Sequence, residues 1–166
     1  MLNNDFFESL NLPLSRKTIV LIDFDNQHGL DMYSLLSNSS LYPELNRIKI
    51  KWHKIYEEND LYNILQQYTL KTDSVLCIPL CWKTSKYNSI LNTIAKHNII
   101  VAPYDKDNLY PWSLPEVFCA KENIEWYYPN ENNQQIQVSG YSVDTVLLSI
   151  IALKGKQYLN NFLKRR

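Results

Sequence analysis

The stretch Thr18–Gly29 decides the fold, and it reads Thr-Ile-Val-Leu-Ile-Asp-Phe-Asp-Asn-Gln-His-Gly. Its first five residues are apolar or β-branched, which is typical of a strand covered on both faces at the centre of a parallel sheet. Asp23, Asp25 and Asn26 follow directly. Open α/β sheets bind their ligands at this end of the strands. The stretch therefore predicts a central strand that ends in a functional site.

The two carboxylates of this stretch are candidate metal ligands. Neighbouring carboxylates repel each other unless a cation or a shared proton offsets their charge. Mg²⁺ and Mn²⁺ are hard cations that prefer oxygen ligands, so Asp23 and Asp25 suit either ion. The alternative is that Asp25 and Asn26 form the turn and the N-terminal cap of the next helix. That alternative leaves Asp23 unexplained, which favours a site.

The composition is that of one globular domain. The 166 residues are 45% hydrophobic and 13% aromatic, enough to bury a core of their own. The 17 basic and 17 acidic residues cancel, so a nucleic-acid partner would need a local basic patch. The cysteines at 77, 81 and 119 have neither zinc nor redox spacing, and we expect them to be reduced in a cytoplasmic protein.

The sequence predicts no membrane partner. The N-terminus lacks the basic and apolar regions of a signal peptide. The longest apolar stretch, Val143–Leu153, is too short and too polar to span a bilayer.

Strand and helix patterns alternate along the chain. Arg47–Tyr56 alternates and predicts a strand near a sheet edge, whereas Ser74–Leu80 and Ile99–Pro103 are continuous apolar runs that predict central strands. The helical patterns cover Leu30–Leu36, Leu61–Leu70, Tyr87–His97 and Val143 to about Leu163. Weaker patterns indicate an arm or short helix over 1–15, a helical turn at Tyr42–Leu45, and two short strands that pair, Glu125–Tyr128 and Ile136–Val138.

This order predicts a single domain over residues 1–166. Alternating strands and helices form a mostly parallel sheet with helices on both faces, a three-layer Rossmann-like α/β fold. No Gly-rich phosphate loop follows any strand, which argues against a dinucleotide site and against a P-loop.

Two segments together resemble the NYN/PIN-like family of ribonuclease domains. The first is Ile-Val-Leu-Ile-Asp-Phe-Asp-Asn-Gln at 19–27, where Asp23 and Asn26 match an apolar strand that ends in Asp with Asn three positions later. The second is Ser-Gly-Tyr-Ser-Val-Asp-Thr-Val-Leu-Leu at 139–148, where Asp144 matches an acidic residue in the first turn of a helix. The resemblance implies a PIN-like fold and metal-dependent hydrolysis of RNA phosphodiester bonds.

The same resemblance implies a role for each matched residue. Asp23 and Asp144 would hold Mg²⁺ or Mn²⁺, Asp25 would be a further ligand, and Asn26 would orient the site or the scissile phosphate. The metal would activate water for attack. The alternative for Asp144 is a favourable interaction with the helix dipole. His28 would contact phosphate or be an exposed loop residue.

One element of the family pattern is not found. Members continue with an apolar strand that ends in Ser-Gly-Asp-x-Asp and supplies the remaining carboxylates, and no such strand follows Asp144 in this sequence. The third carboxylate would then come from Asp105 or Asp107, or from another chain. A homo-oligomer or a partner chain is therefore one expected way to complete the site.

Basic side chains indicate where RNA would bind. The candidates are Lys83 and Lys86 in the polar loop after Ser74–Leu80, and Lys154 and Lys156 on the C-terminal helix. Binders of single strands combine cationic grooves with aromatic platforms. Trp52 is expected in the core because it alternates with the lysines of its own strand. The basic helix end is equally typical of a solvated face.

Two other functions fit the sequence. Asp23-Phe24-Asp25 also matches a haloacid-dehalogenase-like phosphatase, with Asp23 as nucleophile and Asp25 as general acid, although Asn26-Gln27 disfavours it. The other alternative is a catalytically degenerate domain of the PIN-like fold that serves as a binding or assembly module. The missing acidic strand favours that module.

Overall fold

The computed structural model describes residues 14–37, 48–70, 72–81, 85–103, 117–120, 126–129, 135–138 and 140–164. Several predicted features lie outside these residues: the arm over 1–13, the helical turn at Tyr42–Leu45, and the side chains of Lys83, Asp105 and Asp107.

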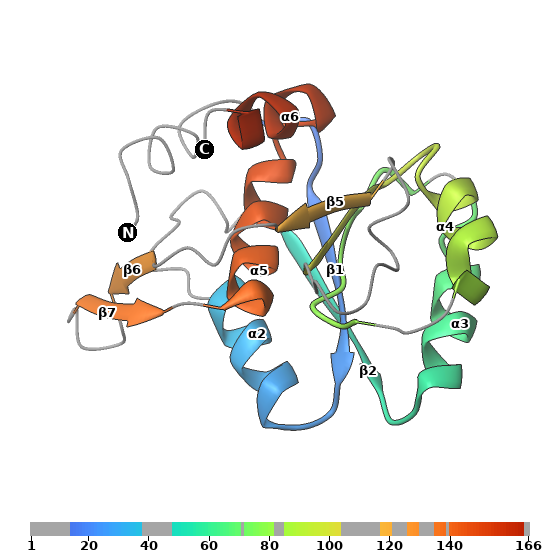
Figure 1. The fold of residues 1–166 in the computed structure, drawn as a ribbon, viewed down its shortest axis with the longest axis horizontal. Coiled ribbons are helices and arrows are strands. Elements are labelled where there is room, and N and C mark those ends of the chain that lie inside the picture. The colour runs from blue at the N-terminus through green and yellow to red at the C-terminus, as the bar shows by residue number, and fades with distance from the viewer. Residues whose placement is uncertain are drawn as a thin grey trace.

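A five-stranded parallel sheet forms the centre of the molecule (Figure 1). Its strand order is β2-β1-β3-β4-β5, one of the common orders of doubly wound sheets, and the direction of winding changes between β1 and β3. The strands are β1 (Thr18–Phe24), β2 (Lys49–Ile55), β3 (Val75–Cys77), β4 (Ile99–Pro103) and β5 (Val117–Ala120).

Helices cover both faces of this sheet, so the predicted three-layer Rossmann-like fold is confirmed. One face carries α2 (Gln27–Ser37), α5 (Tyr141–Ala152) and α6 (Lys156–Lys164), and the other carries α3 (Glu58–Gln66), the 3₁₀ turn η2 (Ser85–Tyr87) and α4 (Asn88–Ile94). Successive side chains of a strand point to opposite faces. Ile19 and Leu21 therefore pack in the core beneath α2, α5 and α6, and Val20 and Ile22 pack in the core beneath α3 and α4.

The central strands lie where the sequence predicts them, although β3 covers only Val75–Cys77 of the predicted Ser74–Leu80. β1 and β3 are parallel neighbours, and both are buried in the sheet. β2 lies at the edge of the sheet and alternates between exposed lysines and inward side chains, as its pattern predicts. Near the C-terminus, β6 (Trp126–Pro129) and β7 (Gln135–Val138) pair antiparallel, so the predicted pairing of these short strands is also confirmed.

The prediction of one continuous helix from Val143 to about Leu163 is wrong. The chain leaves α5 at Ala152 and starts α6 at Lys156, and between them Gly155 has a φ of +108°, a left-handed conformation that glycine adopts without a Cβ penalty. The break is tied to the start of β1, because the carbonyl of Leu153 accepts the backbone N–H groups of Ser15 and Arg16. β5 was not predicted, since its four residues follow closely on Pro111 and Pro115, which interrupt the strand pattern.

The start of α3 differs from its predicted boundary. The helix begins at Glu58, before the apolar stripe that starts at Leu61. Asp60 caps it from the first turn, where its carboxylate accepts the N–H groups of Tyr56 and Glu57 at 2.9 and 3.0 Å. This reciprocal capping box satisfies backbone donors that the helix cannot pair internally.

None of the described helices has the length and the apolar character that a bilayer span requires.

Gly29 allows α2 to start directly against the end of β1. A Cβ at this position would lie 1.9 Å from the carbonyl oxygen of Phe24 and 2.7 Å from the ring of Trp52. Trp52 is half-buried here and stacks on Tyr33 of α2, with ring centroids 5.4 Å apart. Only the absence of a side chain at Gly29 lets α2, β1 and β2 approach this closely.

We expect Gly29→Ala to lower the free energy of unfolding by about 1–3 kcal/mol, because the new methyl group must displace backbone as well as the Trp52 ring. Urea unfolding of the purified chain measures the change. Leu30→Ala, at a neighbouring side chain that is 48% exposed, is the matched control and should cost about 0.5 kcal/mol or less. Equal losses in the two variants would contradict the close approach.

Candidate functional site

The candidate site lies at the carboxyl ends of β1 and β3, where the winding of the sheet changes direction. Asp23 is the penultimate residue of β1, and its side chain is fully buried. α5 runs antiparallel to the strands, so its first turn reaches the same edge, and the Ser142 hydroxyl lies 3.4 Å from the carbonyl oxygen of Pro79, which follows β3 (Figure 1). Switch points of this kind are where doubly wound sheets bind ligands.

The buried carboxylate of Asp23 accepts two hydrogen bonds. Its Oδ1 accepts the backbone N–H of Phe24 at 2.7 Å, and its Oδ2 lies 2.8 Å from Nδ1 of His28. Burial raises the pKa of Asp23 above its ordinary value of 3.8, and the two hydrogen bonds partly oppose that shift. The indole N–H of Trp52 donates to the backbone carbonyl of Asp23 at 3.3 Å.

His28 connects Asp23 to the start of α5. It sits in the first turn of α2, with 42% of its side chain exposed, and not in a loop as one alternative had it. Its Nε2 lies 3.1 Å from the hydroxyl oxygen of Ser142. The three side chains form a continuous hydrogen-bonded row that we call the Asp23–His28–Ser142 relay.

Ser142 is the site residue that sequence reasoning missed. It lies 114 positions from His28, so neither its partner nor its distance is visible in a local pattern. The signal in the sequence was its position at the end of Ser-Gly-Tyr-Ser, directly before an apolar helical pattern. Polar side chains are common at the N-terminus of a helix.

Asp144 is the second fully buried carboxylate at this edge. It lies in the first turn of α5, two residues after Ser142, and that turn contacts the Asp23 side of the sheet through the relay. The structure thus brings together the strand end and the helix start that carry the two motifs.

Asp25 and Asn26 have other partners. Asp25 faces the end of β2, where its carboxylate lies 3.6 Å from the ammonium of Lys54 and accepts the hydroxyl of Tyr56, the residue after the strand, at 3.2 Å. Asn26 caps α2, since its Oδ1 accepts the N–H of Gly29 at 3.1 Å. The contacts of Asn26 are those of the capping alternative, and neither side chain hydrogen bonds to the relay within the described residues.

The predicted RNA-contacting lysines do not gather at the relay. Lys154 and Lys156 follow the C-terminus of α5, a helix of 12 residues that is about 18 Å long, so they lie at the opposite edge of the sheet. The ammonium of Lys156 donates to the carbonyl of Ala95 at 2.6 Å, which ties α6 to the end of α4. Lys83 lies outside the described residues, and Lys86 lies over the α3–α4 face.

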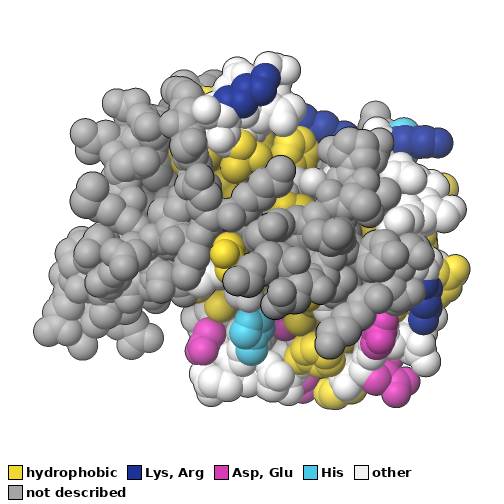
Figure 2. All heavy atoms as spheres, in the orientation of Figure 1, with side chains coloured by type: hydrophobic (Ala, Val, Ile, Leu, Met, Phe, Trp, Pro, Cys, Tyr) yellow, Lys and Arg dark blue, Asp and Glu magenta, His cyan; other side chains and the backbone are white. Residues whose placement is uncertain are grey.

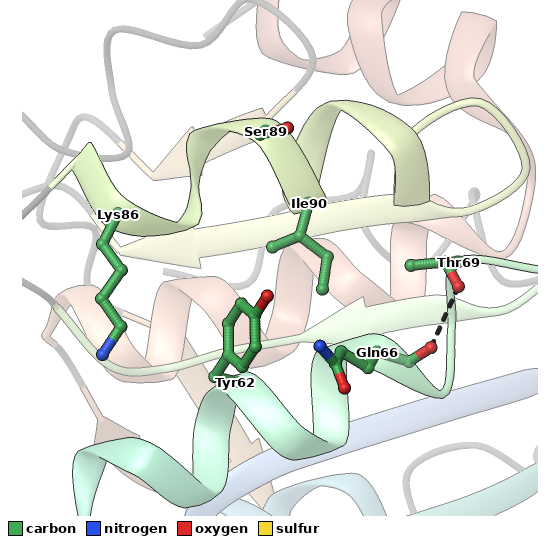
Figure 3. A pocket seen from close by; sticks show the side chains of 6 residues that line it. All are labelled: Tyr62, Gln66, Thr69, Lys86, Ser89 and Ile90. Atoms are coloured by element: carbon green, nitrogen blue, oxygen red, sulfur yellow. Dashed lines mark hydrogen bonds between the residues drawn. The ribbon is translucent and has the colours of Figure 1, made fainter.

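A groove lies between α3 and α4, beside Lys86. Its volume is about 440 Å³, and Figure 3 shows its lining: Tyr62, Gln66, Thr69, Lys86, Ser89 and Ile90. These helices cover the face of the sheet opposite to α2 and α5. The groove therefore does not include the relay.

Charge is distributed unevenly over the described residues. Acidic side chains gather at the edge where β1 and β2 end, and most Lys and Arg side chains in view lie toward the other edge (Figure 2). The acidic residues at that edge are Asp25, Asp31, Glu57, Glu58 and Asp60, together with buried Asp23, and the described basic side chains there include Lys54, 3.6 Å from Asp25, and Lys86, 3.4 Å from Asn59 Oδ1. Such an edge attracts cations and repels anions.

The donor set fits a divalent cation only in part. Two buried carboxylates offer the oxygen ligands that Mg²⁺ and Mn²⁺ prefer. Within the part of the chain that the structure describes, however, no three His, Cys, Asp or Glu side chains are placed to hold a metal ion together. A site with a third protein ligand would take that ligand from outside these residues.

Comparison with known proteins adds no relative: no family model matches the sequence, and neither the curated proteins nor the solved structures contain a match. The family hypothesis therefore depends on residues 19–27 and 139–148 alone.

The raised pKa of Asp23 predicts a pH-dependent difference between the protein and Asp23→Asn. A carboxyl whose pKa is higher in the folded state binds extra protons there, so its contribution to stability falls as pH rises from about 4 through the folded-state pKa. We expect Asp23→Asn to gain stability relative to the wild type over that window, as urea unfolding at several pH values measures. Asp31→Asn, at an exposed carboxylate, should follow the wild type. A constant difference between Asp23→Asn and wild type would contradict the assignment.

Proposed function

We propose that this domain is a PIN-like, NYN-like ribonuclease that hydrolyses RNA phosphodiester bonds with Mg²⁺ or Mn²⁺. The observation that carries the proposal is the full burial of the Asp23 carboxylate at the switch point of the sheet. An ionised carboxylate is expensive to bury unless a positive charge or hydrogen bonds offset the cost. A site that binds a cation supplies that charge.

Asp23 and Asp144 would hold the cation, together with a ligand from outside the described residues. When bound, the cation would activate a water molecule and offset the negative charge that develops on the phosphate. The acidic edge supports this assignment, because it attracts a divalent cation toward the end of β1 and the start of α5, the two elements that carry Asp23 and Asp144 (Figure 2).

A catalytically degenerate binding or assembly module is the second candidate. Both oxygens of Asp23 already accept hydrogen bonds from the protein, which a structural role explains without a cation. The phosphatase alternative gains less support, because Asp25 pairs with Lys54 of β2 and with Tyr56, which follows β2, and would have to leave them to act as a general acid beside Asp23.

Cleavage of single-stranded RNA in Mn²⁺ tests the proposal. We expect the wild type to cut the RNA in millimolar Mn²⁺ and to lose the activity in excess EDTA, and Asp23→Asn to be inactive in both. Asp31→Asn removes an exposed carboxylate of α2 and should retain the activity. RNA that stays intact with the folded wild type in Mn²⁺ would favour the module.

Thermal melting tests the cation without a substrate. Mn²⁺ should raise the melting temperature of the wild type, because only the folded state presents both carboxylates together. Asp23→Asn should respond much less, and it should melt at or above the wild-type temperature without metal, since it carries no buried charge. A destabilised variant, with neither protein responding to Mn²⁺, would mean that Asp23 is a structural acceptor worth about 1–3 kcal/mol.

A further inference from the structure

The Asp23–His28–Ser142 relay has the order of groups that activates a nucleophile: an acid, a base and a hydroxyl. The acid comes from the end of β1, the base from the first turn of α2 and the hydroxyl from the first turn of α5. The two contacts measure 2.8 Å from Asp23 Oδ2 to His28 Nδ1 and 3.1 Å from His28 Nε2 to Ser142 Oγ. Both lie within hydrogen-bond reach, which is the geometric signature of such a nucleophile.

The hydrogen-bond roles along the relay follow from its buried end. A carboxylate only accepts, so His28 donates from Nδ1 to Asp23, and Nε2 is left to accept the hydroxyl proton of Ser142. The N–H of Phe24 holds the other carboxylate oxygen and so keeps the group from turning away. When His28 carries the proton, the Ser142 hydroxyl can donate to the carbonyl of Pro79 at 3.4 Å instead.

The position of Ser142 also suits a reaction that develops negative charge on oxygen. The first hydrogen bond within α5 runs from the N–H of Asp144 to the carbonyl of Gly140, so the N–H groups of Ser142 and Val143 precede the helical ladder. Amide donors at a helix N-terminus stabilise an oxyanion. The relay becomes more accessible from Asp23, which is fully buried, to His28 and Ser142, which both reach solvent.

We infer that Ser142 is a nucleophile for uncharged carboxylic esters, with His28 as its base and Asp23 as the residue that orients His28. Ser142 Oγ bonds to the carbonyl carbon while His28 takes its proton. The bond from that carbon to the leaving oxygen then breaks, and His28 returns the proton to the departing alcohol. Water attacks the acyl-serine by the same route, releasing the acid and restoring Ser142.

An uncharged ester suits the surroundings of the relay better than an anionic one. The Lys54 ammonium lies 3.6 Å from Asp25 and offsets that carboxylate, whereas the exposed carboxylate of Asp31, about one turn of α2 after His28, repels an anion. The inference does not rest on the proposed ribonuclease function, since the relay needs neither RNA nor a cation. A negative result for the ribonuclease proposal therefore does not contradict the ester reaction at Ser142, and the reverse also holds.

Acylation in excess EDTA tests the inference. The full chain is incubated with p-nitrophenyl acetate, release of p-nitrophenol is followed, and peptide mapping by mass spectrometry locates the acetyl group. We expect the acetyl group on Ser142, none on Ser142→Ala, and an acylation rate roughly 10²–10⁴-fold lower in His28→Gln. Ser34→Ala is the matched control, because its hydroxyl is exposed on α2, donates to the carbonyl of Leu30 and lies outside the relay.

The opposite results are equally definite. Acetyl groups found only on other residues, or equal rates in the wild type and His28→Gln, would overturn the inference. Bis-p-nitrophenyl phosphate is the anionic arm, and turnover of this diester through Ser142 without turnover of the acetate would overturn the substrate class. The peptide map of the wild type decides the matter alone if a variant does not fold.

Asp23→Asn tests the orienting role. The N–H of Phe24 would hold the amide oxygen, so the amide NH₂ would face Nδ1 of His28 and force the proton onto Nε2. Nε2 could then no longer accept the hydroxyl proton of Ser142. We expect ¹⁵N NMR to show the Nε2–H form and acylation to slow to the level of His28→Gln. Acylation by Asp23→Asn at the wild-type rate would overturn the role of Asp23.

Discussion

The full burial of the Asp23 carboxylate is the constraint on which the carboxyl edge of this protein depends. A carboxylate in the interior needs donors on both oxygens, and the backbone of its own strand supplies only the N–H of Phe24. The second donor has to come from another element, and His28 provides it because α2 begins only three residues after β1. The start of α2 is thus fixed by an electrostatic need as well as by packing.

Asn26 and Gly29 fix the start of α2 in different ways. Asn26 accepts the N–H of Gly29 and so replaces a hydrogen bond that the first turn cannot make internally. Gly29 removes the side chain that would otherwise separate the helix from the carbonyl of Phe24 and the ring of Trp52. A cap without the close approach would leave His28 too far from Asp23, and a close approach without the cap would leave a buried N–H without an acceptor.

The parts of the fold that could be predicted are those whose signal is local. Thr18–Ile22 does not alternate and lies at the centre of the sheet, whereas β2 alternates and lies at its edge. A strand that is buried on both faces needs apolar residues at every position, and an edge strand needs them at every second position. Asp23 stood out for the same reason, as an acid directly after an apolar run. The relay could not be predicted, because His28 and Ser142 are 114 residues apart and meet only through the topology of the sheet. The break at Gly155 was missed because a single glycine in a helical pattern does not by itself end a helix, and its positive φ is visible only in the structure.

The charge at the carboxyl edge separates the two chemistries that this site can support. RNA is a polyanion, and the described residues at this edge include more acidic than basic side chains. The Lys54 ammonium lies 3.6 Å from Asp25 and the Lys86 ammonium donates to Asn59 of α3 at 3.4 Å, whereas Lys156 of α6 lies about a helix length away. A bound cation would offset the remaining negative charge and favour the approach of RNA to Asp23, so the proposed ribonuclease function depends on a bound metal. An uncharged ester faces no such barrier, and its carbonyl carbon needs only the hydroxyl of Ser142 and the base beside it. A dependence on bound cation therefore distinguishes the proposed ribonuclease chemistry from the ester chemistry at Ser142.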